Sequence, residues 1–254
     1  MAVLIAISTK DFDPTEVAVP WRILSEAGVD VVFATDSGQV GAADPRMIDG
    51  NGFGILKPFL IANKSARTAY ASLLSDKAFQ APIAYSDVRP EDFDALLLPG
   101  GHAKAVIPYL ESDILHRAIS GFFAADKPIG AICHGVVTAC RATNPDTGKS
   151  VLYGRRTTAL LKRQERLAYH LTRARLGDYY LTYPVTVEDE VRATLRAPAD
   201  FIAGPTPVLR DDKKHLNRGF TVRDGMYLSA RWPGDIHRFS FEFLKMLDEY
   251  QART

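Results

Sequence analysis

A cysteine followed by a histidine stands where an aliphatic run gives way to a helix-forming stretch. Residues 129–132 are Ile-Gly-Ala-Ile, Cys133 and His134 follow, and Gly135 opens the next apolar segment. A strand that turns into a helix within two residues holds the side chain at the turn out at the carboxyl edge of a sheet. The helix N-terminus favours a thiolate, and the adjacent imidazole is a base or an ion-pair partner. We therefore expect Cys133 to be a nucleophile with a lowered thiol pKa.

The alternative for Cys133 is a buried cysteine that only packs as a small hydrophobe. The glycines at positions 130 and 135 relieve crowding around a tight turn, and they favour the nucleophile. Cys140 lies about two helical turns further on. We expect it to pack in the core, or to act as a resolving thiol.

A second chemical signal is the turn Pro99-Gly100-Gly101-His102, which follows the aliphatic residues 95–98. Without a Cβ in the way, backbone N–H groups of such a turn can point into the crevice outside the strand ends, where the Gly101 amide would hold a developing oxyanion. A simple turn with no chemical role is the alternative.

These side chains need a sheet to position them. Residues 2–8 form a continuous aliphatic run, residues 15–27 place apolar side chains on one helical stripe that Gly28 ends, and residues 29–34 form a second aliphatic run. This β-α-β order predicts an α/β fold with a mostly parallel sheet and helices on both faces. Further strands are expected at 95–98 and 128–132, a hairpin at 220–230, and helices near 66–74, 114–125, 136–142, 160–176, 185–195 and 239–250.

The composition excludes several classes of protein. With 254 residues, 46% hydrophobic, and 31 basic against 30 acidic side chains, the chain fits one soluble domain and lacks the charge excess of a nucleic-acid binder. Two cysteines cannot build a disulfide framework, and the apolar start is too short to span a membrane. We therefore expect a cytoplasmic protein with no nucleic-acid or membrane partner.

The segments 99–102, 131–135 and 16–20 together resemble the ThiJ/PfpI superfamily, and most of all its glyoxalase III and heat-shock chaperone branch. The resemblance implies a flavodoxin-like three-layer sandwich. It implies a single domain over residues 1–254 of the class I glutamine amidotransferase-like type, with a divergent insert around residues 160–215. Homodimers are usual in the superfamily, so a homodimer is expected.

The resemblance also assigns roles to residues. It implies Cys133 as nucleophile, the amides of Gly101 and His134 as oxyanion donors beside Gly100, and Glu16 as the acid whose proton meets the sulfur. An acid that orients the histidine falls at Glu165 by spacing, where a carboxylate would fix the His134 tautomer. The alternative is that Glu165 pairs with a neighbouring cation on an exposed, basic helix face.

Other segments bear on the substrate and on cofactors. Trp232 and His237, with Arg231, follow the last expected strand, and relatives place that loop beside the pocket; a purely structural role is equally compatible. The tyrosine-rich residues 177–183 are expected to pack at a surface or to line the pocket. Neither late histidine is followed two positions on by Glu, which disfavours a glutaminase. We expect no metal and no cofactor.

The expected function is a cysteine-dependent enzyme acting on small reactive carbonyls. It would be a glutathione-independent glyoxalase, converting methylglyoxal to lactate, or a deglycase. The alternatives are a cysteine hydrolase or hydratase of an amide, nitrile-like or cyclic substrate, and a holding chaperone or oxidative-stress sensor.

Overall fold

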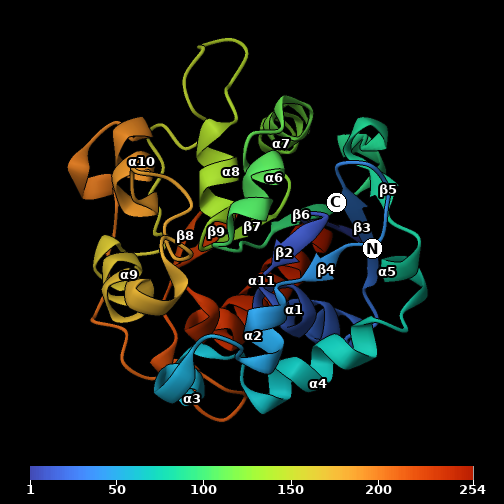
Figure 1. Ribbon diagram of the computed structural model, residues 1–254. Coiled ribbons are helices and arrows are strands. Elements are labelled where there is room, and N and C mark those ends of the chain that lie inside the picture. The colour runs from blue at the N-terminus through green and yellow to red at the C-terminus, as the bar shows by residue number, and fades with distance from the viewer. Residues whose placement is uncertain (254) are drawn as a thin grey trace.

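The computed structural model describes residues 1–253 and has a seven-stranded sheet at its centre (Figure 1). All neighbouring strands are parallel except for the hairpin at one edge. The innermost strands are aliphatic and buried, as strands covered on both faces must be. In spatial order the strands are β5 (Ile83–Ala84), β3 (Asp30–Thr35), β1 (Ala2–Ala6), β6 (Ala95–Leu98), β7 (Ile129–Ile132), β9 (Tyr227–Ala230) and β8 (Thr221–Asp224).

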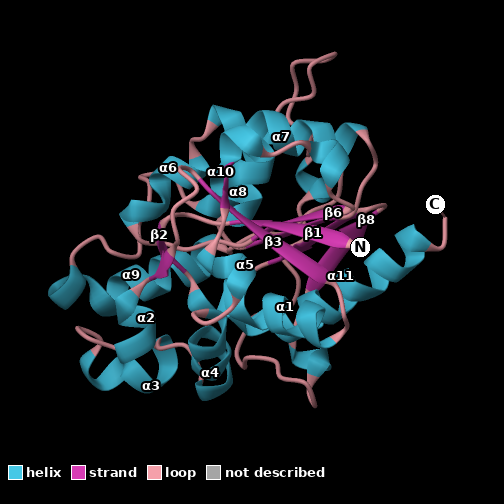
Figure 2. Ribbon diagram, turned by 90° about the vertical axis from the view of Figure 1, so that its right-hand side faces the viewer, coloured by secondary structure: helices cyan, strands magenta, loops and turns pink. Residues whose placement is uncertain are grey.

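Helices cover both faces of this sheet (Figure 2), which confirms the flavodoxin-like α/β sandwich. One apolar core lies between the sheet and the helices α6 (Ile107–Leu110), α7 (Asp113–Ala124), α8 (Gly135–Arg141) and α10 (Val187–Thr194). The other lies beneath α1 (Pro14–Glu26), α4 (Lys64–Leu73), α5 (Lys77–Gln80) and α11 (Ile236–Gln251). The helices predicted near 15–27, 66–74, 114–125, 136–142, 185–195 and 239–250 are therefore present.

The segment after β3 holds more structure than its scattered glycines and prolines indicate. A small parallel pair forms between β2 (Lys10–Phe12) and β4 (Ala42–Ala43). Two short helices follow, α2 (Pro45–Asp49) and α3 (Lys57–Leu60). These elements are stabilised by tertiary contacts rather than by a long apolar period, which is why the sequence pattern does not reveal them.

The expected basic helix is α9 (Lys162–Leu176), and with α10 it makes up the helical part of the region around residues 160–215. Only Glu165 and Thr172 of α9 are buried. None of the helices within residues 1–253 combines the length and apolarity that crossing a membrane requires.

Candidate active site

The turn between β7 and α8 holds Cys133 in a backbone conformation that residues other than glycine rarely adopt. Its φ is +57°, in the left-handed region, which is the strain typical of a nucleophile elbow. Two residues on, α8 passes so close to the end of β6 that a Cβ on Gly135 would lie 2.0 Å from the Leu98 carbonyl oxygen. Glycine at 135 therefore lets the helix start directly above the neighbouring strand, beside the thiol.

The loop after β6 and the start of α1 bring Glu16 to the same place. Asp13 caps α1 by accepting hydrogen bonds from the amides of Thr15 (2.7 Å) and Glu16 (3.1 Å). The Asp13 amide donates to the Gly100 carbonyl oxygen (3.1 Å), and the Gly100 amide donates to Glu16 Oε2 (2.8 Å). Glu16 is consequently held in the first turn of α1, fully buried, against the Cys133 elbow.

Burial shifts the protonation of Glu16. Desolvation and the nearby Asp13 raise the pKa of Glu16 well above its ordinary value, which favours the protonated carboxyl. Its Oε1 is buried with no hydrogen-bond partner among residues 1–253, and the carboxyl interacts with the Cys133 thiol. The structure thus places a carboxyl group with a raised pKa against the sulfur.

His134 is held as a neutral base on the other side of the thiol. The Thr182 hydroxyl donates to the His102 carbonyl oxygen (2.6 Å), so at 2.9 Å it must accept from Nε2–H of His134. That tautomer leaves a lone pair on Nδ1, which lies 3.4 Å from Cys133 Sγ. Burial lowers the pKa of His134 to about 3, so an imidazolium–thiolate ion pair is disfavoured and a proton acceptor remains.

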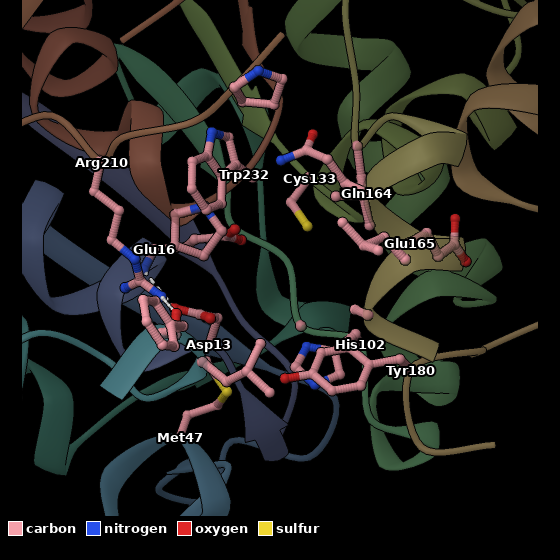
Figure 3. Close-up of a pocket in the computed structure, with 18 of the residues that line it drawn as sticks. Asp13, Glu16, Met47, His102, Cys133, Gln164, Glu165, Tyr180, Arg210 and Trp232 are labelled. Atoms are coloured by element: carbon pink, nitrogen blue, oxygen red, sulfur yellow. Dashed lines mark hydrogen bonds between the residues drawn. The ribbon is translucent and has the colours of Figure 1, made fainter. Parts of the chain in front are cut away.

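The expected contact between Glu165 and His134 is not formed. Thr182 occupies the Nε2 position instead, while Glu165 Oε2 accepts a hydrogen bond from the Val187 amide (3.0 Å) at the start of α10. Figure 3 shows the Glu165 carboxylate directed away from the Cys133 sulfur, although its stem lines the cavity. The spacing was correct in placing Glu165 near the site, but the turn of α9 points its carboxylate to α10.

The expectation of a lowered thiol pKa is also not met. Burial, together with the carboxyl groups of Glu16 and Asp13, raises the pKa of the Cys133 thiol. The N-terminus of the seven-residue α8 favours the thiolate but does not outweigh these effects. The structure therefore places a thiol with a raised pKa between the Glu16 carboxyl and the His134 ring.

The amides near the sulfur are not equivalent. Gly100 was expected among the oxyanion donors, but its N–H is engaged by Glu16. A Cβ there would lie 2.7 Å from the His134 nitrogen, so Gly100 permits close approach instead. Within the described residues, nothing accepts the N–H of Gly101, and the N–H of His134 is directed at the Cys133 sulfur. Those two amides remain the candidates for holding an oxyanion.

A cavity of about 240 Å³ opens above Cys133. Trp232 lines it, as expected, together with Gly101 and His102. His237 does not: its Nδ1 lies 3.1 Å from Asp211 Oδ1, and the pair is buried elsewhere at the start of α11. Arg231 likewise forms a buried ion pair with Asp235 (2.8 Å). Their expected contacts with substrate are replaced by structural ones.

Three residues of the site escaped the sequence analysis. Arg210 lines the cavity with Nη1 buried and unpartnered among residues 1–253, and its guanidinium lies 5.8 Å from the Trp232 ring centroid. No local sequence signal marks Arg210 as a site residue, and none marks Thr182 within the tyrosine-rich residues 177–183. Asp13, by contrast, had a signal: Asp before Pro at a helix start is a typical cap.

No group of three His, Cys, Asp or Glu side chains in the described part of the chain is arranged to hold a metal ion. The structure thus brings together Cys133, His134, Glu16 and Gly101, with Trp232 on the cavity wall, while their catalytic roles remain predictions.

Comparison with known proteins agrees with this architecture. The chain is 25% identical to a deglycase of Pyrococcus abyssi over 247 residues, covering 97% of this chain and 99% of the relative. It is 27% identical over 146 residues to an uncharacterised protein of Schizosaccharomyces pombe. That alignment covers 54% of this chain and about half, 53%, of the relative.

Among solved structures, a glyoxalase III of Candida albicans superposes with a TM-score of 0.68 at 16% identity, covering 97% of each chain. At that identity the likeness shows the fold alone. Residues 7–205 match the family described as ThiJ/PfpI family-like. Because this match covers most of the molecule, the chain belongs to the ThiJ/PfpI family.

Proposed function

We propose that the protein is a cysteine-dependent enzyme that acts on small reactive carbonyls, as a glutathione-independent glyoxalase or as a deglycase. The observation that carries the proposal is the placement of one thiol between a buried carboxyl with a raised pKa, Glu16, and a neutral base, His134 Nδ1 at 3.4 Å. The names of deglycase relatives and the glyoxalase III fold support the same class.

The first step forms a C–S bond. The Cys133 thiol attacks the aldehyde carbon of methylglyoxal, its proton passes to His134 Nδ1, and the alkoxide that develops on the aldehyde oxygen faces the Gly101 and His134 amides. The alkoxide then takes that proton back. The product is a neutral hemithioacetal, and His134 is again free to act as a base.

The second step moves hydrogen between two carbons. His134 takes the proton on the hemithioacetal carbon while Glu16 protonates the adjacent ketone oxygen, which gives an enediol. The imidazolium then protonates the ketone carbon, and the other hydroxyl returns its proton to Glu16. Water finally cleaves the resulting thioester, releasing lactate and the free thiol, so no redox cofactor is consumed.

The test is lactate formation from methylglyoxal in the absence of glutathione. Wild type and the matched control Cys140→Ala are expected to form lactate. Cys140 lies on α8, is buried in the apolar core and does not line the cavity. Cys133→Ala and Glu16→Ala are expected to fall to the background of the buffer. Lactate formation by Cys133→Ala at the wild-type rate, or none by wild type, would overturn the proposal.

A further inference from the structure

The helix α9 carries two leucines, Leu167 and Leu171, that pack against no core, although Ala168 beside them packs against the small buried cluster of Met47, Phe53 and Tyr180. Leu167, Ala168 and Leu171 follow one another at the spacing of one helical face and line the cavity above Cys133. Leu167 is 59% exposed and Leu171 is 53% exposed. The opposite face carries exposed basic side chains such as Arg166 and Arg173. An amphipathic helix normally buries its apolar face, so this one lacks an occupant.

The wall across the cavity is apolar as well. Phe59 and Leu60 of α3 and Met47 of α2 line the same space, and Phe59 is 76% exposed. Helices far apart in the sequence, α9, α3 and α2 (Figure 1), thus line one opening, where Phe59 is exposed and Met47 is buried against Phe53 and Tyr180. We call α9 residues Leu167, Ala168 and Leu171, with Phe59, Leu60 and Met47, the apolar lip.

The cavity is larger than a three-carbon aldehyde needs. At roughly 30 Å³ per water molecule, its volume of about 240 Å³ corresponds to about eight waters, about twice the space of methylglyoxal. Polar side chains line the rest of the cavity around Cys133, among them Glu16, Gln164 and Arg210 (Figure 3). A ligand that fits both ends has a reactive polar head and an apolar tail.

We propose that the substrate is a carbonyl compound with an apolar alkyl or aryl substituent, whose carbonyl meets Cys133 while its substituent fills the apolar lip. This inference rests on the proposed function and specifies its substrate class. Burial of the substituent removes apolar surface of both partners from water, so binding strengthens with each added methylene. The reaction is the one above, from a substituted 2-oxoaldehyde and water to the corresponding 2-hydroxy acid.

A series of straight-chain 2-oxoaldehydes tests this directly, from methylglyoxal to hexylglyoxal, because lengthening the chain hardly changes the electrophilicity of the aldehyde. The measurement is kcat/KM for 2-hydroxy acid formation without glutathione. We expect kcat/KM to rise about threefold per methylene, and about two-hundredfold over the five methylenes from methyl to hexyl. If kcat/KM stays constant along the series while turnover still requires Cys133, this inference is overturned and the proposed function is left intact.

A variant of the lip separates its contribution from chain length itself. Leu171→Gln keeps the helix and the approximate volume while making the wall polar, so the increase per methylene is expected to fall below about twofold. The matched control is Leu74→Gln, because Leu74 ends α4, is 44% exposed and does not line the cavity. The control is expected to keep the wild-type increase per methylene, and loss of that increase in both variants would contradict the proposal.

The third arm reports binding without turnover, so that the inference is tested even if the glyoxalase proposal fails. Cys133→Ala is titrated with 2-octanone and with acetone, and the Tm is followed. We expect 2-octanone to raise the Tm at concentrations where acetone does not, and Leu171→Gln to remove that rise. Equal effects of the two ketones would overturn the inference.

Light scattering of Leu171→Gln completes the test. If the lip were covered by a second copy of the chain, this variant would dissociate the oligomer and leave the increase per methylene unchanged. That pair of results would overturn the proposal, whereas an unchanged oligomer with a reduced increase supports it.

Discussion

The floor of the cavity and its wall are built in opposite ways. The floor consists of Cys133, His134, Glu16 and Gly100, which sit at the carboxyl ends of central strands or at the start of α1, and backbone contacts fix them. The wall comes from α9 and α3, outside the sheet, and exposes its apolar side chains. The comparison teaches that the sheet determines which chemistry is available, while peripheral helices determine what is admitted.

Unpartnered polar atoms occur in both regions. Glu16 Oε1 at the floor is buried without a partner in the described residues, and so are Gln164 Oε1 and Arg210 Nη1, whose side chains line the cavity. Glu16 Oε2 and both His134 ring nitrogens do have partners. Because buried polar atoms without partners are rare in folded proteins, these three atoms are among those that a bound ligand would satisfy.

The sharpest way to break the floor is to add one methyl group. In Gly135→Ala the new Cβ would overlap the Leu98 carbonyl, where backbone cannot yield, so we expect a loss of more than about 3 kcal/mol in unfolding free energy. Urea unfolding followed by circular dichroism measures it. The control is Gly154→Ala in a surface loop, where no atom lies within 4 Å and only the positive φ of +84° costs about 1 kcal/mol. Equal losses would contradict the distinction.

Glu16→Gln keeps a hydrogen-bond acceptor for the Gly100 amide but cannot transfer a proton. Turnover of 2-oxoaldehydes is expected to fall about a thousandfold. Because burial favours the protonated, uncharged form of Glu16, this substitution removes little charge, so the pKa of Cys133, measured by the pH dependence of iodoacetamide alkylation, is expected to change little. A more readily formed thiolate with faster turnover would show that Glu16 acts only on the thiol pKa.

Glu165→Gln tests the wall through stability. Burial raises the pKa of Glu165 to about 7, against 4.5 for the free group. The folded state therefore holds this proton more tightly than the unfolded state, and its stabilising effect is lost as the pH rises from about 4.5 to 7. Relative to wild type, Glu165→Gln is expected to gain about 3 kcal/mol of unfolding free energy between pH 4 and pH 8. A pH-independent difference would contradict a buried, titrating carboxyl.

Thr182→Val removes the acceptor that fixes the His134 tautomer. We expect kcat to fall about thirtyfold with little change in KM, because Nδ1 is then protonated in part of the molecules and cannot accept the thiol proton. Nitrogen chemical shifts of His134 report the tautomer, and Thr182→Ser is expected to restore both. The matched control is Thr172→Val on α9, a buried threonine that bonds only within its helix.

A merely structural role for Thr182 would lower stability without moving the His134 shifts. A larger loss of kcat in Glu165→Gln than in Thr182→Val would return the orienting role to Glu165.

Local pattern was sufficient for part of the floor. Aliphatic runs at β1, β6 and β7 must be buried strands, and a Gly-flanked cysteine where strand meets helix has few other uses, so Cys133 and Gly101 followed from neighbouring residues. Glu16 required the family resemblance, because an acid at a helix start looks like any other. The wall was not predictable: the leucines of α9 appeared as part of an exposed basic helix, since periodicity does not say what a face meets.

By itself, the sequence determined the order of strands and helices, the elbow at Cys133 and the glycines that the close approaches require, because these depend on residues near one another in the chain. Only the tertiary structure decided that Thr182 orients His134, that the Gly100 amide donates a hydrogen bond to Glu16, and that the Glu165 carboxylate points toward α10. The tertiary structure also set the protonation of Glu16 and of His134. Each of these outcomes depends on atoms that the fold brings together from distant segments and removes from water. Residues adjacent in the sequence determine neither the contacts nor the burial.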